Sequence, residues 1–232
     1  ASGRIDLSIP FYLRSAFAAG WPQTLAGRGC LTPVCADLDH DGSRELIVGT
    51  ASGIEIFQSN GSRRIGFPAL AHTDLRGIPA IYDVDRDYKD EIIVLASDGL
   101  HVMKLNGVEA PIFPRRFTVE PSAYGYPTPT VTSFGYGSDT VITFVDNNAV
   151  VQAYRLNGNP YLYSLGGKYT TFSTGQASAA YFNGNSVTAV DLNGDGTTEV
   201  ITTFSSRTPG SGVIYTTAAP ANRRSASLHR TP

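Results

Sequence analysis

The sequence predicts an all-β fold, and three features of its composition support this prediction. Charged residues are only 16% of the 232 residues, well below the roughly 25% of an ordinary soluble domain, which excludes a protein of long charged helices. Glycine and proline occur 24 and 14 times, which indicates many turns. The 12 tyrosines and 11 phenylalanines, with abundant threonine and valine, favour strands.

Short apolar runs recur along the chain in four units, and we expect each run to form a strand. Asn-Gly, the strongest short hairpin signal, follows the last strand of three units. The expected strands are 33–36, 46–48 and 53–57, then 80–82, 92–94 and 99–103, then 141–144 and 150–154, and finally 187–190, 200–202 and 213–217. A β-sandwich also has many short strands, but it does not require this one order of strands, loops and turns four times.

An acidic segment of nine residues stands between the first two strands of three units. The segments are 37–45, 83–91 and 191–199, and a degenerate copy without carboxylates at these positions starts near residue 133. The four loop starts are 46, 50 and 58 residues apart. A period near 50 residues with about four strands per unit is typical of a propeller blade. We therefore expect a β-propeller built from four blades.

The spacing of the acidic residues points to a calcium site in each complete loop. Side-chain oxygens stand at positions 1, 3, 5 and 9, and the backbone carbonyl of position 7 completes a set of oxygen ligands that suits a hard cation. We expect two to three Ca²⁺ ions. The candidate ligands are Asp37, Asp39, Asp41, Ser43 and Glu45, then Asp83, Asp85, Asp87, Lys89 and Glu91, and finally Asp191, Asn193, Asp195, Thr197 and Glu199.

Three alternatives to such a blade loop fit the acidic segments less well. An EF-hand needs glutamate at position 12, where Val48, Val94 and Thr202 stand. A dockerin-like loop needs a following helix, and a solvated acidic turn does not account for three copies at matching places. The loops are unequal, because Asn193 is a neutral ligand and because Tyr88 replaces the glycine of position 6, where a left-handed backbone is costly.

Each acidic loop leads into an Ile/Val strand, and Asn60-Gly61 precedes Phe67-Pro68. In these features, residues 17–217 resemble the FG-GAP/VCBS repeats of integrin-α-like β-propellers, bacterial surface proteins and some fungal lectins. The resemblance implies calcium in the blade loops, an extracellular location (secreted or at the cell surface), and a role in adhesion or ligand binding. It does not imply an enzyme.

Four repeats are fewer than the seven or eight blades usual in that family, and three possibilities stay open. The chain is a fragment of a larger propeller, or it closes by an exchange in which residues 5–13 complete the last blade, or it self-associates to complete a ring. We assign residues 1–217 to the propeller repeats. Residues 218–232, rich in arginine and serine, are predicted to be a disordered tail or a linker.

The expected function is non-catalytic adhesion or the binding of a protein ligand. A carbohydrate-binding lectin of the same fold and an accessory domain of a secreted polysaccharide-acting enzyme are the alternatives. Tyr124 and Tyr126, in a stretch rich in proline and glycine, and Trp21 are the candidate ligand-binding residues, because aromatic rings suit sugars and protein partners. Packing between blades is an equally available role for Trp21.

The partners are expected to be a protein or a glycan. The net charge of −2 provides no field that would attract nucleic acid, and no apolar run is long enough for membrane insertion. Cys30 and Cys35 lie five residues apart, and the sequence leaves open whether they form a disulfide or remain thiols.

Overall fold

Antiparallel sheets make up the regular structure of the chain. The computed structural model describes residues 18–71, 73–116, 128–134, 139–145, 150–161, 163–165, 168–170, 172–173, 187–194, 199–205 and 212–218. Within these ranges every regular element is a strand, and the strand pairings are all antiparallel. The all-β fold class predicted from the composition is therefore confirmed.

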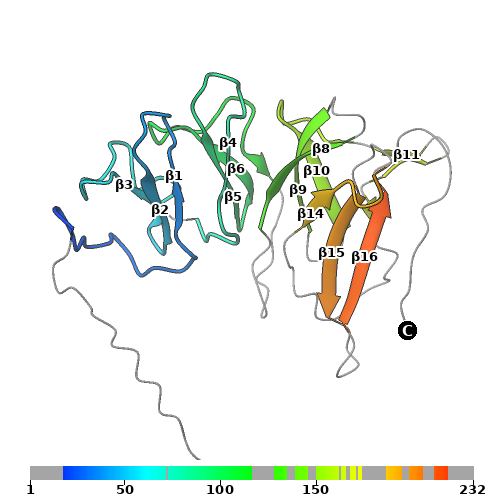
Figure 1. The fold of residues 1–232 in the computed structure, drawn as a ribbon, viewed down its shortest axis with the longest axis horizontal. Coiled ribbons are helices and arrows are strands. Elements are labelled where there is room, and N and C mark those ends of the chain that lie inside the picture. Colours follow the sequence, from blue (N-terminus) through cyan, green and yellow to red (C-terminus); the bar gives the residue numbers. More distant parts are fainter. Residues whose placement is uncertain are drawn as a thin grey trace, which may run out of the picture.

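The described strands form four successive sheets and one separate hairpin (Figure 1). The first sheet has the order β1-β2-β3, the second β4-β5-β6-β7, the third β13-β10-β9-β8 and the last β14-β15-β16, whereas β11 pairs with β12. The strands are β1 (Val34–Ala36), β2 (Glu45–Thr50), β3 (Gly53–Phe57), β4 (Ala80–Tyr82), β5 (Glu91–Ala96), β6 (Gly99–Met103), β7 (Arg115–Arg116), β8 (Thr130–Phe134), β9 (Asp139–Val145), β10 (Val150–Arg155), β11 (Tyr163–Leu165), β12 (Lys168–Thr170), β13 (Phe172–Ser173), β14 (Thr188–Val190), β15 (Glu199–Ser205) and β16 (Gly212–Ala218).

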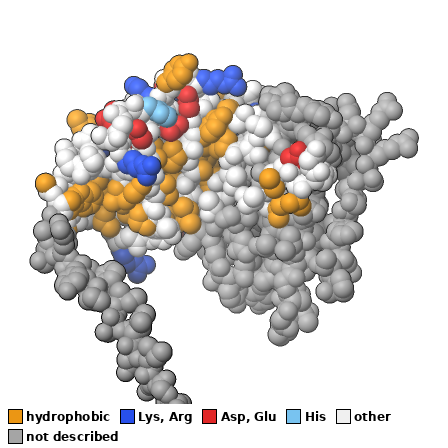
Figure 2. Space-filling model, viewed as in Figure 1, with side chains coloured by type: hydrophobic (Ala, Val, Ile, Leu, Met, Phe, Trp, Pro, Cys, Tyr) orange, Lys and Arg blue, Asp and Glu red, His pale blue; other side chains and the backbone are white. Residues whose placement is uncertain are grey.

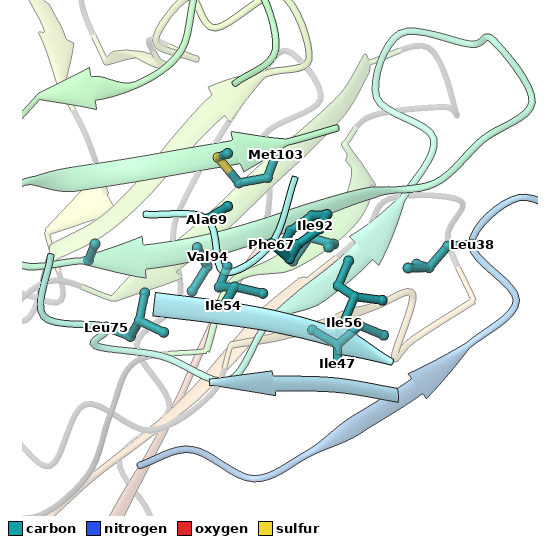
Figure 3. Close-up of a cluster of buried hydrophobic side chains, with 11 residues drawn as sticks. Leu38, Ile47, Ile54, Ile56, Phe67, Ala69, Leu75, Ile92, Val94 and Met103 are labelled. Atoms are coloured by element: carbon teal, nitrogen blue, oxygen red, sulfur yellow. The ribbon is translucent and has the colours of Figure 1, made fainter. Parts of the chain in front are cut away.

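The second sheet is buried on both faces by its neighbours. Successive residues of a strand point to opposite faces, and all residues of β5 are buried. Ile92 packs with Ile54 of the first sheet, in the cluster of apolar side chains that Figure 3 shows between the two sheets. Ile93 packs in another cluster with Ile142 and Phe144 of the third sheet. The first three sheets are therefore stacked face to face.

Neighbouring units also touch backbone to backbone at glycines. Gly66 of the first unit lies against the Asn106-Gly107 turn of the second, and a Cβ atom on Gly66 would collide with the Asn106 carbonyl oxygen. Gly20 and Gly61 make the same kind of contact one unit earlier in the chain. The glycine of these two Asn-Gly turns thus permits close packing between units as well as the turn itself.

The third unit departs from the expected pattern at two places. β8 continues to Phe134, which pairs with Asp139 of β9, so the connection starts at residue 135 rather than near 133. This connection spans 135–138, which lie outside the described residues and are too few for a nine-residue loop. The β11–β12 hairpin, which the sequence did not suggest, is inserted between β10 and its partner β13.

The ends of the predicted domain are only partly described. β16 includes Ala218, one residue beyond the expected boundary at 217. Residues 5–13 and 219–232 lie outside the described residues, so the strand exchange and the disordered tail stay predictions. Cys30 and Cys35 are free thiols, and both are exposed. In the described ranges no helix has the length and apolar character needed to cross a bilayer.

Candidate metal centres

The first two acidic loops occupy the same place in neighbouring sheets. Residues 37–45 join β1 to β2, and residues 83–91 join β4 to β5, so each loop ends on a glutamate that opens the central strand. We number the loop positions 1 to 9 from the first aspartate. Figure 2 shows acidic and basic side chains and a histidine gathered on the surface over these two sheets.

Both loops are held by the same four hydrogen bonds from backbone N–H groups to carboxylates. The carboxylate of position 1 accepts from positions 5 and 6, that of position 5 accepts from position 7, and that of position 9 accepts from position 2. In the first loop the bonds are Asp41 N to Asp37 Oδ1 (3.0 Å), Gly42 N to Asp37 Oδ2 (2.9 Å), Ser43 N to Asp41 Oδ1 (2.7 Å) and Leu38 N to Glu45 Oε2 (2.9 Å). In the second loop they are Asp87 N to Asp83 Oδ1 (3.1 Å), Tyr88 N to Asp83 Oδ2 (3.0 Å), Lys89 N to Asp87 Oδ1 (3.0 Å) and Val84 N to Glu91 Oε2 (2.8 Å).

The backbone of each loop is left-handed at positions 4 and 6. In the first loop His40 has φ 56° and Gly42 has φ 89°, and in the second Arg86 has φ 62° and Tyr88 has φ 65°. Tyr88 therefore adopts the conformation that its missing glycine would have taken, at a cost of roughly 1–2 kcal/mol. The sequence did not reveal the same requirement at position 4, where neither loop has glycine.

The carboxylates of each loop converge as a metal site requires. Oxygen atoms of Asp37, Asp39 and Asp41 all lie within 4.8 Å of one another, as do those of Asp83, Asp85 and Glu91. Asp39 Oδ1 is buried and has no hydrogen-bond partner. A donor set of carboxylate oxygens with an unsatisfied buried acceptor fits a hard divalent cation such as calcium.

The remaining predicted ligands are placed differently in the two loops. Glu45 lies outside the first cluster of three, with Oε2 on the Leu38 N–H group and Oε1 3.8 Å from Arg64. Asp87 lies outside the second cluster, although its Oδ1 accepts from the Lys89 N–H group as Asp41 Oδ1 accepts from Ser43. The expected roles of the Ser43 and Lys89 carbonyls stay predictions.

Burial makes the position 9 glutamates reluctant to ionise. The side chain of Glu91 is 1% exposed, and its burial raises the pKa to about 7. The Val84 N–H group opposes this rise, Asp85 adds to it and Lys104 opposes it. Burial also raises the pKa of Glu45, against the hydrogen bond from Leu38. A cation in either loop would compensate this buried negative charge.

Comparison with known families identifies the third acidic loop. Residues 183–216, which contain this loop and the strands around it, match the FG-GAP repeat. The chain carries an FG-GAP repeat. This match confirms the expected FG-GAP resemblance at the third acidic loop, and FG-GAP repeats commonly bind calcium. A comparison with curated protein sequences gives no significant match.

Two solved structures are similar to the chain that carries this FG-GAP repeat. BBS1N, crystallised in complex with ARL6DN and soaked with lead, has a TM-score of 0.52 and 12% identity over 92% of this chain and 57% of its own. The Vibrio cholerae biofilm matrix protein Bap1 has a TM-score of 0.44 and 19% identity over 80% of this chain and 26% of its own. The chain therefore spans about a quarter of Bap1 and just over half of BBS1N, and the likeness to BBS1N concerns the fold alone.

The loop of the FG-GAP repeat is described only at its beginning. Asp191 Oδ1 accepts a hydrogen bond of 2.7 Å from the N–H group of Gly194, whose φ of 74° matches position 4 of the other loops. Asn193 is exposed beside it. Asp195 and Thr197 lie outside the described residues, and Glu199 is the first residue of β15.

The two described loops contact each other across the boundary between units. The N–H group of Asp90 donates to the Leu38 carbonyl at 2.8 Å, and Asp90 Oδ2 lies 3.4 Å from His40 Nε2. The conformation of the first acidic loop is therefore coupled directly to that of the second acidic loop.

Two basic side chains reach the loops, and the sequence reasoning missed both. Arg64 lies 2.9 Å from Asp39 and also donates to the Leu105 carbonyl at 3.2 Å. Lys104 contacts Asp85 and lies 3.6 Å from Asp87. Both contacts join residues 17 or more positions apart, so no local pattern indicates them.

The candidate aromatic residues fall into two groups. The Trp21 ring packs against Phe57, with centroids 5.8 Å apart, and its Nε1 donates to the Ser59 carbonyl at 3.2 Å. This places the ring against the first sheet, and its part in ligand binding stays a prediction. Tyr124 and Tyr126 lie outside the described residues.

Proposed function

We propose that the chain is a calcium-stabilised β-propeller module that binds a protein or glycan ligand outside the cell and has no catalytic role. The observation that carries the proposal is the shared hydrogen-bond pattern of two acidic loops in adjacent sheets, each of which brings three carboxylates within 4.8 Å. A sheet stacked between two others supports a propeller, because blades in a ring cover each other's faces.

Calcium has a structural part in this proposal. Each loop joins an edge strand to a central strand, and the Asp90–Leu38 hydrogen bond connects the two loops. An ion that neutralises one loop therefore also stabilises the contact between units. A rigid array of loops at one end of stacked sheets is a suitable platform for a ligand, because loops on a stable scaffold commonly carry binding residues.

The two described histidines that could serve as general bases have carboxylate neighbours. His101 is 2% exposed, and its ring nitrogens lie 2.7 Å from Glu109 and 2.8 Å from Asp98. His40 lies beside Asp90 on the loop surface. These environments support a structural use of both rings, in keeping with a binding module.

Thermal unfolding in calcium and in chelator tests the metal proposal. Calcium at about 100 times its Kd should stabilise the wild type by about 2.7 kcal/mol per site and raise the melting temperature by several degrees. Asp37→Ala should reduce this gain, whereas Asp74→Ala, an exposed carboxylate outside the loops, should keep it. Equal melting temperatures for metal-free and calcium-loaded wild type would refute the metal proposal.

A glycan array, probed in calcium and again in chelator, tests the ligand class. Binding to a defined sugar that disappears in chelator would make the protein a lectin of this fold. If folded, calcium-loaded protein binds no sugar, the protein-ligand form of the proposal is favoured. Release of reducing ends from a polysaccharide by the pure protein would contradict the non-catalytic assignment.

A further inference from the structure

Lys104 directly follows β6 and reaches the second acidic loop from within the same unit. Its ammonium group contacts Asp85 Oδ2 and lies 3.6 Å from Asp87 Oδ2. The side chain is about a quarter exposed, so the ion pair is partly shielded from water. Asp85 belongs to the cluster that would hold the metal, so the lysine already provides one positive charge there.

The charge of Lys104 is firmly held. The hydrogen bond to Asp85 is the largest influence that raises the pKa of Lys104. A fixed ammonium group beside two carboxylates opposes a divalent cation in two ways. It repels the ion, and it competes with the ion for the carboxylate of Asp85.

The equivalent place in the first unit has a neutral residue. Gln58 directly follows β3, and its N–H group closes a turn on the Ser62 carbonyl at 2.8 Å. Lys104 closes the same turn on the Val108 carbonyl, also at 2.8 Å. At the equivalent place the last sheet has Ala218, which is paired with Glu199 in the strand register. By the same register Lys104 stands opposite Glu91 in the second sheet.

The first loop has a different basic neighbour. Arg64 Nη2 binds Asp39 Oδ2 while its Nε atom is engaged by the Leu105 carbonyl of the next unit. This arrangement leaves Asp39 Oδ1 buried without a partner. An acceptor for a metal thus persists in the first loop beside its arginine.

We propose that Lys104 is a built-in counter-ion of the second loop that lowers its calcium affinity. The inference rests on the calcium binding proposed above. The affinity of this loop is then set in part by a residue outside the loop motif.

Calorimetric titration of the full chain with calcium chloride at low ionic strength tests this inference. Lys104→Gln, which places the glutamine of the first unit at this position, should tighten one class of sites about tenfold. Lys104→Arg should keep the wild-type affinity, because it retains the charge. Arg28→Gln, at an exposed arginine outside both loops, removes the same charge and should leave the isotherm unchanged.

The reciprocal variant Gln58→Lys supplies a second test if Lys104→Gln fails to fold. It should weaken calcium binding by the first loop, since it adds an ammonium group at the equivalent place of the first unit. Calcium binding by the wild type with unchanged affinities in both variants would overturn the role of Lys104 and leave the metal proposal intact. No calcium binding by any variant would overturn the metal proposal itself, and this inference with it.

Discussion

The first and second units follow the same backbone course but place an acid and a base in opposite order at the same position. In the first, Glu55 of β3 is fully buried and pairs with Arg63 at 2.8 Å. In the second, His101 of β6 takes the place of Glu55, and Glu109 takes the place of Arg63, at 2.7 Å. The repeat therefore has an acid–base pair at this position in both units. The acid lies on the strand in the first unit, and the base lies on the strand in the second.

The largest difference between the units should appear in their cores. Ile92→Ala removes a fully buried side chain between two sheets and should lower the free energy of unfolding by about 3–4 kcal/mol. Leu46→Ala, at the equivalent place in the first unit, removes a half-buried side chain and should cost about 1–2 kcal/mol. Urea unfolding in calcium measures both. Equal losses would mean that the first sheet is as well covered as the second.

Breaking the buried pair of the first unit should have the next largest effect. Arg63→Ala leaves the carboxylate of Glu55 buried with the Ala26 N–H group as its remaining donor, at a cost of about 2 kcal/mol, because Arg63 is itself about a third exposed. The double variant Glu55→His with Arg63→Glu imports the pair of the second unit and should recover part of this loss. Recovery should be incomplete, since Ser52 stands where Asp98 supports His101. A double variant less stable than Arg63→Ala would show that the order of the charges matters.

The metal-free protein should lose stability as the pH rises. The folded-state pKa of Glu91, about 7, lies above the value of about 4.5 for an unfolded chain, so the folded state holds the proton more tightly. This stabilisation is complete below pH 4.5 and is lost as the pH rises through 7. Urea unfolding at pH 5 and pH 8 in metal-free buffer measures it. Glu91→Gln should reduce the dependence of the unfolding free energy on pH, and Glu45→Gln in the first unit should reduce it less. If the unfolding free energy of Glu91→Gln changes with pH as that of the wild type does, Glu91 is not the group responsible.

The smallest effect should come from position 6 of the two loops. Tyr88→Gly relieves a left-handed tyrosine that is 87% exposed, and should stabilise the metal-free protein by up to about 1 kcal/mol. Gly42→Ala in the first loop should destabilise it by a similar amount. Melting temperatures of the two variants should therefore move in opposite directions. Shifts of the same sign would show that the tyrosine side chain contributes contacts of its own.

The sequence predicted those features that depend on residues close together in the chain. The run at 53–57 forms a strand with the expected bounds, and so does the run at 99–103, because alternation and the flanking turns define them locally. The spacing of Asp37, Asp41 and Glu45 likewise sets hydrogen bonds within one loop.

Features that depend on distant residues were not visible in the sequence. Arg64 meets Asp39 across 25 positions, and Lys104 meets Asp85 across 19. The start of the third loop was also predicted too early. Residues near Ser133 resemble a loop in the sequence alone, and only their pairing with β9 shows that they belong to a strand. Packing of Trp21 on Phe57 likewise requires the tertiary structure.

The contact between Gly66 and Asn106-Gly107 has a consequence for how such repeats assemble. Because the two backbones touch directly, the distance between the two units at this point is set by backbone atoms alone. Any side chain added there would act as a wedge and change the angle between adjacent sheets. One methyl group at this contact would therefore alter the angle between the first and second sheets, and with it the curvature of the array.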